Sequence, residues 1–206
     1  IYKSSKLKCD HVPRELQEMS ATSKDLKETG VVIPTTILFS SLTLPVQKTD
    51  GSWRMAVDYY NLTGGDLIAA AVLDNVISLF EQINTWHLNV AIDLKCAFSS
   101  IPAHKVHKKD FTFSCQCYQY IFTVLPQWYI NSSALCHNLE CRDLVRLAIP
   151  PNITLVHYID DILLIRTSEQ EVANTMDLLV RHLHARGWEI YSTKTQEPST
   201  SVKFLG

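Results

Sequence analysis

The chain has 206 residues, enough to bury a substantial hydrophobic core in one large or two small domains. Apolar residues make up 46% and charged residues 19%, with only 6 Gly and 8 Pro, which excludes a disordered or collagen-like chain. The net charge of −2 excludes the strongly basic field of many nucleic-acid-binding proteins, although basic residues cluster at 3–8 and 104–109. Each cluster fits a phosphate contact and an ordinary solvated surface equally well.

The longest apolar stretches, at 67–73 and 162–165, fall short of the roughly 18 to 20 residues that span a bilayer, so no membrane partner is expected. The first ten residues have neither an initiator Met nor an apolar signal core, which predicts no signal peptide and suggests a fragment.

The six cysteines do not form the pattern of a small disulfide-rich secreted domain. Reduced thiols in the cytoplasm or nucleus are therefore expected. Cys115-x-Cys117 and His182-x-His184 each lack a second ligand pair at zinc-like spacing, so no zinc site is predicted.

Alternating strand-like and helix-like segments predict an α+β fold. Two β-type runs, at 43–46 and 53–59, predict a hairpin closed by an Asp-Gly turn. Helical spacing of apolar residues predicts a helix over 74–83, and alternation predicts a strand over 90–94. The β-rich segment 114–125 predicts a further strand pair.

Asn131 is predicted to cap a helix that stops before Pro150 and Pro151. The next helix has a capping-box pattern in Ser168 and Glu171.

Gly187 is well placed to end this second helix. Closing strands are predicted at 188–191 and 202–205.

Adjacent carboxylates, Asp160 and Asp161, interrupt the apolar run NITLVHYIDDILLIR at 152–166, which predicts a hairpin with acids at its tip. Neighbouring carboxylates held against apolar strands repel one another and lose hydration, which favours protonation or a bound cation. Asp93, on one face of the strand at 90–94, would add a third carboxylate from across a sheet. Three such ligands suit Mg²⁺ and phosphoryl transfer, whereas an Asp-Asp pair alone is more often an acidic turn on the surface.

Several segments carry a family pattern, in order: WRMAVDYYNL (53–62), AIDLKCAFSSIP (91–102), FTVLPQWYINSSALCHNL (122–139), ITLVHYIDDILLI (153–165) and VKFLG (202–206). They resemble successive blocks of retroviral reverse transcriptases, of gammaretroviral or endogenous-retroviral type. Tyr158-Ile159-Asp160-Asp161 is similar to the Y-x-D-D signature of that family.

The resemblance implies the fingers and palm of a right-hand polymerase fold, with an antiparallel palm sheet backed by helices. The fingers would comprise 1–67 and 101–132, and the palm 68–100 and 133–206. Thumb, connection and ribonuclease H regions of a longer polyprotein would be missing, which predicts a poor grip on a duplex.

The resemblance also implies an RNA-directed DNA polymerase that uses two Mg²⁺ or Mn²⁺ ions about 3.5 to 4 Å apart. Asp93 and Asp160 would bridge the ions, and Asp161 would complete the metal site. One ion would activate the primer 3′-hydroxyl, and the other would stabilise the pyrophosphate leaving group. The implied partners are a primed RNA or DNA template and deoxynucleoside triphosphates.

The nucleotide-binding residues implied by the resemblance are Lys48, Arg54, Leu94, Lys95, Cys96, Ala97, Phe98 and Gln127. Lys48 and Arg54 would bind the triphosphate, and Phe98 would exclude a ribose 2′-hydroxyl. Without the resemblance, the two cations would be solvated hairpin charges and Phe98 a core residue.

The chain departs from the family at several positions. Trp128 stands where Gly usually follows LPQ, and its indole is predicted to obstruct the nucleotide site. Cys96 replaces the usual Asp or Asn; Ser99, Ser133, Tyr60 and Asn61 are further changes.

These departures predict weak or no activity in the isolated chain. The main alternative is an inactive viral remnant or a domesticated nucleic-acid-binding module. A different metal-dependent phosphoesterase is a third class, and it would need neither the triphosphate clamp nor the sugar gate.

Overall fold

The computed structural model describes residues 14–48, 51–60, 62 and 88–204. The helix predicted over 74–83 lies outside these residues.

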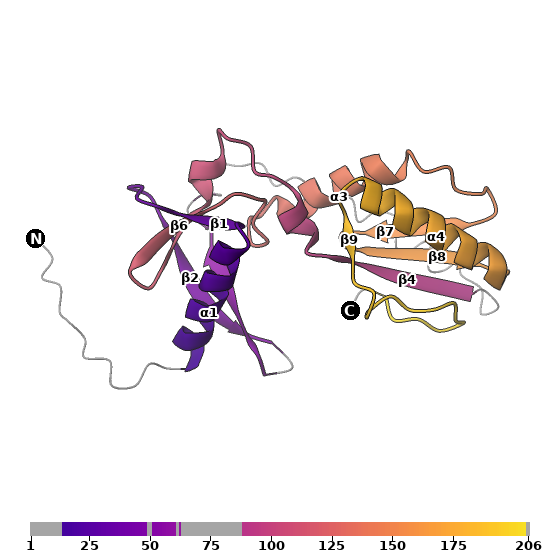
Figure 1. Cartoon of the computed structure of the whole chain (residues 1–206), viewed down its shortest axis with the longest axis horizontal. Helices are drawn as coiled ribbons and strands as arrows, with labels where there is room; N and C mark the ends of the chain where they lie inside the picture. The colour runs from indigo at the N-terminus through magenta and orange to yellow at the C-terminus, as the bar shows by residue number, and fades with distance from the viewer. Residues whose placement is uncertain (1–13, 49–50, 61, 63–87, 205–206) are drawn as a thin grey trace, which may run out of the picture. The chain divides into compact units, whose positions relative to one another are not determined.

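The chain divides into two compact units, which Figure 1 shows with their helices and strands. Unit 1 comprises Ile1–Asp66 and Ala103–Val124, and unit 2 comprises Leu67–Pro102 and Leu125–Gly206. Both contain helices and antiparallel strands, so the predicted α+β class is confirmed. The assignment of fingers and palm, with its boundaries, stays a prediction.

Unit 1 contains a five-stranded sheet in the order β1-β6-β5-β2-β3, against which helix α1 packs. Its elements are α1 (Arg14–Glu28), β1 (Val32–Thr35), β2 (Ser41–Gln47), β3 (Trp53–Asp58), the 3₁₀ helix η2 (Lys108–Phe111), β5 (Thr112–Cys115) and β6 (Tyr118–Phe122). The predicted hairpin is confirmed as β2 and β3, and the predicted strand pair as β5 and β6.

Unit 2 contains a four-stranded sheet in the order β7-β8-β4-β9, in which every neighbouring pair is antiparallel. Its elements are β4 (Leu88–Lys95), the 3₁₀ helix η1 (Ala97–Ser100), α3 (Ser132–Leu144), β7 (Thr154–Tyr158), β8 (Asp161–Arg166), α4 (Glu169–Ala185) and β9 (Glu189–Ile190). The strand predicted over 90–94 is confirmed as part of β4, and the predicted acidic hairpin as β7 and β8.

The two faces of this sheet are covered differently, because successive residues of a strand point to opposite sides. Val90, Ile92 and Leu94 of β4 pack in the main core with α3 and α4. Figure 1 shows α4 running along the sheet on this side. Ala91 belongs to a smaller cluster on the other face of the sheet. The C-terminal segment, residues 191–204, covers this cluster through Val202 and Phe204. We call these the helix face and the open face.

Helix α4 ends in the way that its sequence predicts. Gly187 has φ +87°, a conformation that glycine adopts without steric cost. Its N–H donates to His184 C=O at 3.0 Å, and Trp188 N–H donates to Leu183 C=O at 3.0 Å. This pair of bonds is a Schellman motif, which satisfies carbonyls at the helix end.

The predicted capping box of α4 is wrong. Ser168 occupies the N-cap position, but its side chain makes no capping hydrogen bond. Glu171 instead accepts hydrogen bonds from Arg166 Nε at 2.7 Å and from Asn152 Nδ2 at 3.3 Å. A charge-assisted bond to Arg166 is stronger than a neutral capping bond, so the Glu171 carboxylate bonds Arg166 instead of capping the helix.

Two other predictions need correction. Asn131 is the N-cap residue of α3 but makes no side-chain capping bond, and the helix ends at Leu144, well before the prolines. Its final turn tightens into i→i+3 bonds, such as Leu147 N–H to Leu144 C=O.

The predicted closing strand at 202–205 is wrong over its described residues, 202–204. The backbone groups of Lys203 bond the Gln196 side chain instead of a neighbouring strand. The earlier closing strand, predicted over 188–191, is present but confined to β9. None of the described helices is long and apolar enough to cross a membrane.

Candidate active site

Carboxylates from two neighbouring strands meet at one end of the unit 2 sheet. In the register of β4 and β8, Asp93 lies directly opposite Asp161. Asp160 lies in the tight turn between β7 and β8, and its carbonyl accepts a hydrogen bond from Leu94 N–H at 2.8 Å. This bond and the strand pairing hold the turn against β4, although Asp93 is 67 positions before Asp160 in the sequence. Side chains of paired residues share a face, so Asp93 and Asp161 both lie on the open face.

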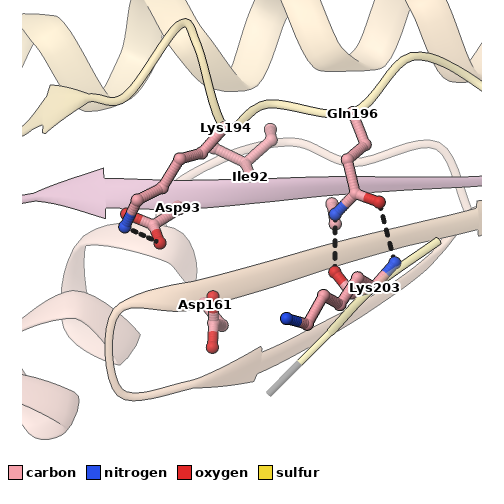
Figure 2. Close-up of a pocket in the computed structure, with 7 residues that line it drawn as sticks. Ile92, Asp93, Asp161, Lys194, Gln196 and Lys203 are labelled. Atoms are coloured by element: carbon pink, nitrogen blue, oxygen red, sulfur yellow. Dashed lines mark hydrogen bonds and ion pairs between the residues drawn. The ribbon is translucent and has the colours of Figure 1, made fainter. Parts of the chain in front are cut away.

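These two carboxylates line a cavity of about 410 Å³. Its walls are formed by Ala91, Ile92, Asp93, Asp161, Lys194, Gln196 and Lys203. Figure 2 shows Asp93 and Asp161 projecting from neighbouring strands, with Lys194 over Asp93. Gln196 forms the wall beside Lys203. Its Nε2 donates to Lys203 C=O at 2.6 Å, and its Oε1 accepts from Lys203 N–H at 2.7 Å. The C-terminal segment thus closes one side of the cavity.

A lysine partly neutralises the carboxylates. Lys194 Nζ lies 2.8 Å from Asp93 Oδ2 and 4.4 Å from the ring centroid of Tyr191. The hydrogen bond to Asp93 raises the pKa of Lys194. Burial raises the pKa of Asp160, and repulsion from Asp93 adds to the effect, while Lys194 opposes it. The negative charge of these carboxylates is therefore poorly solvated, which favours a bound cation.

Lys194 was not predicted as a site residue, because it follows β9 without any local motif. Only the fold of the C-terminal segment over the open face brings it to Asp93.

The loop after β4 holds several of the residues expected to contact a nucleotide. Leu94 and Ala97 are buried, whereas Lys95 forms an exposed ion pair with Glu189 at 2.9 Å. Phe98 packs against the main core. Cys96 is exposed and adopts φ +53°, in the left-handed region that Asn and Asp tolerate better than other side chains. The family's usual Asp or Asn at this position therefore suits the backbone better than Cys.

The other expected nucleotide-binding residues are all exposed. Lys48 and Arg54 lie on the β2–β3 hairpin of unit 1, whereas the carboxylates belong to unit 2. Gln127 and Trp128 belong to unit 2, and Trp128 exposes 36% of its surface. Trp128 is not among the described residues with positive φ, so the indole requires no strained backbone there.

A second cluster of polar side chains, which the sequence did not predict, lies behind the turn between β7 and β8. Ile159 adopts φ +53°, an unfavourable conformation for a β-branched residue. Its N–H donates to His137 Nδ1 at 3.4 Å, and its carbonyl accepts from His157 Nε2 at 2.7 Å. Two imidazoles thus bind both polar groups of the strained residue next to Asp160.

Helix α3 also supplies Glu140 and Cys141 to this cluster. Burial raises the pKa of Glu140 and of Cys141, and burial together with His157 lowers the pKa of His137. The H-x-x-x-C spacing at 137–141, one helical turn, was the only available sequence signal.

Unit 2 is thus an antiparallel sheet backed by helices on one face, with acidic residues at the tip of the β7–β8 hairpin. The family model described as "Reverse transcriptase (RNA-dependent DNA polymerase)" matches residues 46–206, and the chain belongs to this family.

Relatives and solved structures agree with this assignment. The chain is 28% identical over 197 residues to the Pro-Pol polyprotein of feline foamy virus, covering 94% of this chain and 16% of that protein. It is 29% identical over 199 residues to the Gag-Pro-Pol polyprotein of sheep pulmonary adenomatosis virus, covering 91% and 11%. The chain thus spans less than a fifth of these polyproteins. The gammaretroviral type stays a prediction.

Among solved structures, a foamy viral protease-reverse transcriptase in complex with double-stranded DNA superposes with a TM-score of 0.81 at 25% identity, covering 92% of this chain and 33% of that one. A crystal structure of the prototype foamy virus protease-reverse transcriptase, a CSH mutant, gives a TM-score of 0.82 at 26% identity, covering 95% and 26%. The predicted reverse-transcriptase fold is therefore confirmed.

Proposed function

We propose that this chain forms the nucleotidyl-transfer site of an RNA-directed DNA polymerase, with Asp93, Asp160 and Asp161 as its catalytic carboxylates. The observation that carries the proposal is the strand register, which sets Asp93 opposite Asp161 beside the Asp160 turn. The proposed substrates are a primed RNA or DNA template and deoxynucleoside triphosphates. A related foamy viral enzyme has been solved in complex with double-stranded DNA, which supports a duplex partner.

The residues at the cavity fit divalent metal ions, which reverse transcriptases generally use. Mg²⁺ and Mn²⁺ prefer carboxylate oxygens, and the open-face cavity presents Asp93 and Asp161. The raised pKa of Asp160 also fits, because a nearby cation would relieve the burial of its charge. When bound, two such ions would supply Lewis acidity at the attacking and leaving oxygens.

Each residue of the chain then has a separate task. Asp93 and Asp160 would hold the ions between them, and Asp161, which lies opposite Asp93 on the open face, would complete the metal site. Lys194, now bonded to Asp93, has a protonated amine that can bind a phosphate oxygen once the carboxylate turns to a metal. Lys48 and Arg54 would bind the triphosphate, and template selection would come from base pairing.

Next to the carboxylates, the loop after β4 would position the nucleotide. The backbone from Leu94 to Ala97 would approach it, with Phe98 beside the sugar and Gln127 near the base.

The competing hypothesis is an inactive protein that keeps the fold, either a remnant or a nucleic-acid-binding module. Cys96 and Trp128, at positions that the family fills with Asp or Asn and with Gly, favour it. Binding of a primed template without extension would support this alternative.

Single-nucleotide primer extension on an RNA template, with Mg²⁺ or Mn²⁺, tests the proposal. The chain should extend the primer weakly, as its departures from the family predict, and the Asp160→Asn, Asp161→Asn double variant should not extend it at all. Asp177→Asn, which changes an exposed carboxylate on α4, is the matched control and should extend normally. If the chain is folded by circular dichroism and neither protein extends, the inactive alternative holds.

Trp128→Gly, assayed in the same way, tests the predicted obstruction. Extension should increase, because the substitution removes an indole from beside the nucleotide site. Unchanged extension by a folded variant would show that Trp128 is not the obstruction.

A further inference from the structure

Three potential metal ligands gather on the helix face of unit 2, behind the turn between β7 and β8 that holds Asp160. His137 and Cys141 lie one turn apart on α3, and His157 lies on β7. Cys141 Sγ is 3.5 Å from His137 Nε2 and 3.4 Å from His157 Nδ1. One ligand atom from each residue lies within 4.8 Å of the other two. These side chains are set apart from Asp93 and Asp161, because His157 points to the opposite face of the sheet.

The two sulfur–nitrogen separations match those around a tetrahedral metal ion. With Zn–N bonds of about 2.0 to 2.1 Å and Zn–S bonds of about 2.3 Å, nitrogen and sulfur ligands lie about 3.6 Å apart. Both sulfur–nitrogen distances are within a few tenths of this value. Three protein ligands leave a fourth position for water, as in open zinc sites.

A buried carboxylate orients one ligand. Glu140, whose side chain is fully buried, contacts His157 Nε2 through Oε2. Ile159 C=O also lies 2.7 Å from Nε2, and both neighbours are acceptors, so Nε2 carries the hydrogen. In the neutral ring Nδ1 then holds the lone pair, and this atom faces Cys141 Sγ. Metal-binding histidines usually donate the N–H of their second ring nitrogen to a carboxylate in this way.

The Cys136 thiol fixes the other oxygen of the carboxylate, since Sγ donates to Glu140 Oε1 at 3.0 Å. The orienting group is therefore held from two sides before any ion arrives.

We propose that His137, Cys141 and His157 bind one zinc-class divalent ion, with Glu140 as the residue that positions His157. A thiolate and two imidazoles select Zn²⁺ or Co²⁺ over Mg²⁺, which takes oxygen ligands. Binding converts the Cys141 thiol to a thiolate and releases its proton to solvent, so one proton leaves for each ion bound.

The ion would also change the hydrogen bonds to Ile159, in the turn between β7 and β8. The rings of His137 and His157 stack with centroids 4.5 Å apart and planes 1° apart. A metal lies in the plane of each imidazole that it binds, so His137 must turn out of this stack. That turn breaks its long bond to Ile159 N–H, whereas the bond from His157 to Ile159 C=O remains. Metal binding should therefore alter the backbone next to Asp160.

Titration of the purified, reduced chain with Co²⁺ tests the proposal, since a cobalt–thiolate bond gives a charge-transfer absorption band. One equivalent should bind with this band, and Zn²⁺ should displace it. Cys141→Ser should abolish the band, and Glu140→Gln should weaken binding about 10- to 100-fold. Cys117→Ser and His184→Gln, at exposed positions outside the cluster, are the matched controls and should bind normally.

The Asp160→Asn, Asp161→Asn variant should keep the band, which separates this site from the proposed polymerase site. In the amide spectrum of ¹⁵N-labelled chain, Zn²⁺ should shift Ile159. A folded wild-type chain without a thiolate band would overturn the proposal whatever the variants do. A band that persists in Cys141→Ser would overturn it too. The thiol would then be only a hydrogen-bonded neighbour of two imidazoles.

Discussion

The two faces of the unit 2 sheet carry different chemistry within a few residues of one hairpin tip. The open face presents carboxylate oxygens, from Asp93 and Asp161, beside a partly exposed lysine. The helix face presents nitrogen and sulfur, from His157 and α3, around the buried Glu140. Because successive strand residues point to opposite sides, one hairpin can offer hard ligands to one face and softer ligands to the other.

The burial of the two faces also differs. The Lys194 side chain is 56% exposed in its ion pair with Asp93, whereas His157 and Glu140 are 5% and 0% exposed in theirs. Charges on the open face remain accessible to solvent, whereas those on the helix face are buried in contacts within the fold. Substitutions on the two faces should therefore affect different measurements.

The largest effect is expected when each face is changed and both readouts are measured. Asp93→Asn should lower primer extension about 100-fold or more, because metal-held charge is worth several kcal/mol and each 1.36 kcal/mol is tenfold. It should leave the cobalt–thiolate band intact. Cys141→Ser should remove the band and, in extension assays without Zn²⁺ or Co²⁺, keep extension within about threefold, less than 1 kcal/mol in the barrier. Loss of both readouts in either folded variant would contradict the separation of the faces.

A smaller effect is expected on stability, measured by urea unfolding without metal. Glu140→Ala should lower the free energy of unfolding by about 3 kcal/mol, because it leaves partners of a buried carboxylate unsatisfied. Lys194→Ala, which removes a partly exposed ion pair, should cost less than about 1 kcal/mol.

Asp177→Ala, at an exposed position in the middle of α4, is the control and should stay within about 0.5 kcal/mol. Equal losses for Glu140→Ala and Lys194→Ala would show that burial does not distinguish the faces.

The smallest effect concerns the loop that leads away from the open face. Cys96→Asn should raise the free energy of unfolding by about 0.5 to 1 kcal/mol, since Asn tolerates the left-handed conformation at φ +53°. Cys117→Asn makes the same change at an exposed cysteine without positive φ, and it should not stabilise the chain. Equal unfolding curves for the wild type and Cys96→Asn would mean that Cys96 carries no strain.

Sequence reasoning succeeded where the physical signal is local. The β2–β3 hairpin, the β7–β8 hairpin and the Gly187 stop were all predictable, because turn chemistry and strand alternation act between near neighbours. Predictions failed where a group from outside the predicted element competed. Glu171 bonds Arg166 and Asn152 instead of capping α4, and Gln196 occupies the backbone of the expected strand at 202–205.

The sequence by itself determined the family, the fold class and the three aspartates proposed for catalysis, because ordered motif blocks and strand patterns are properties of the chain. Only the tertiary structure decided which groups meet. It set Asp93 opposite Asp161, brought Lys194 over Asp93, and gathered His137 and Cys141 with His157 behind the β7–β8 turn. The physical reason is that these contacts join elements far apart in the chain, and register and helix packing, which bury apolar faces, determine them rather than local preference.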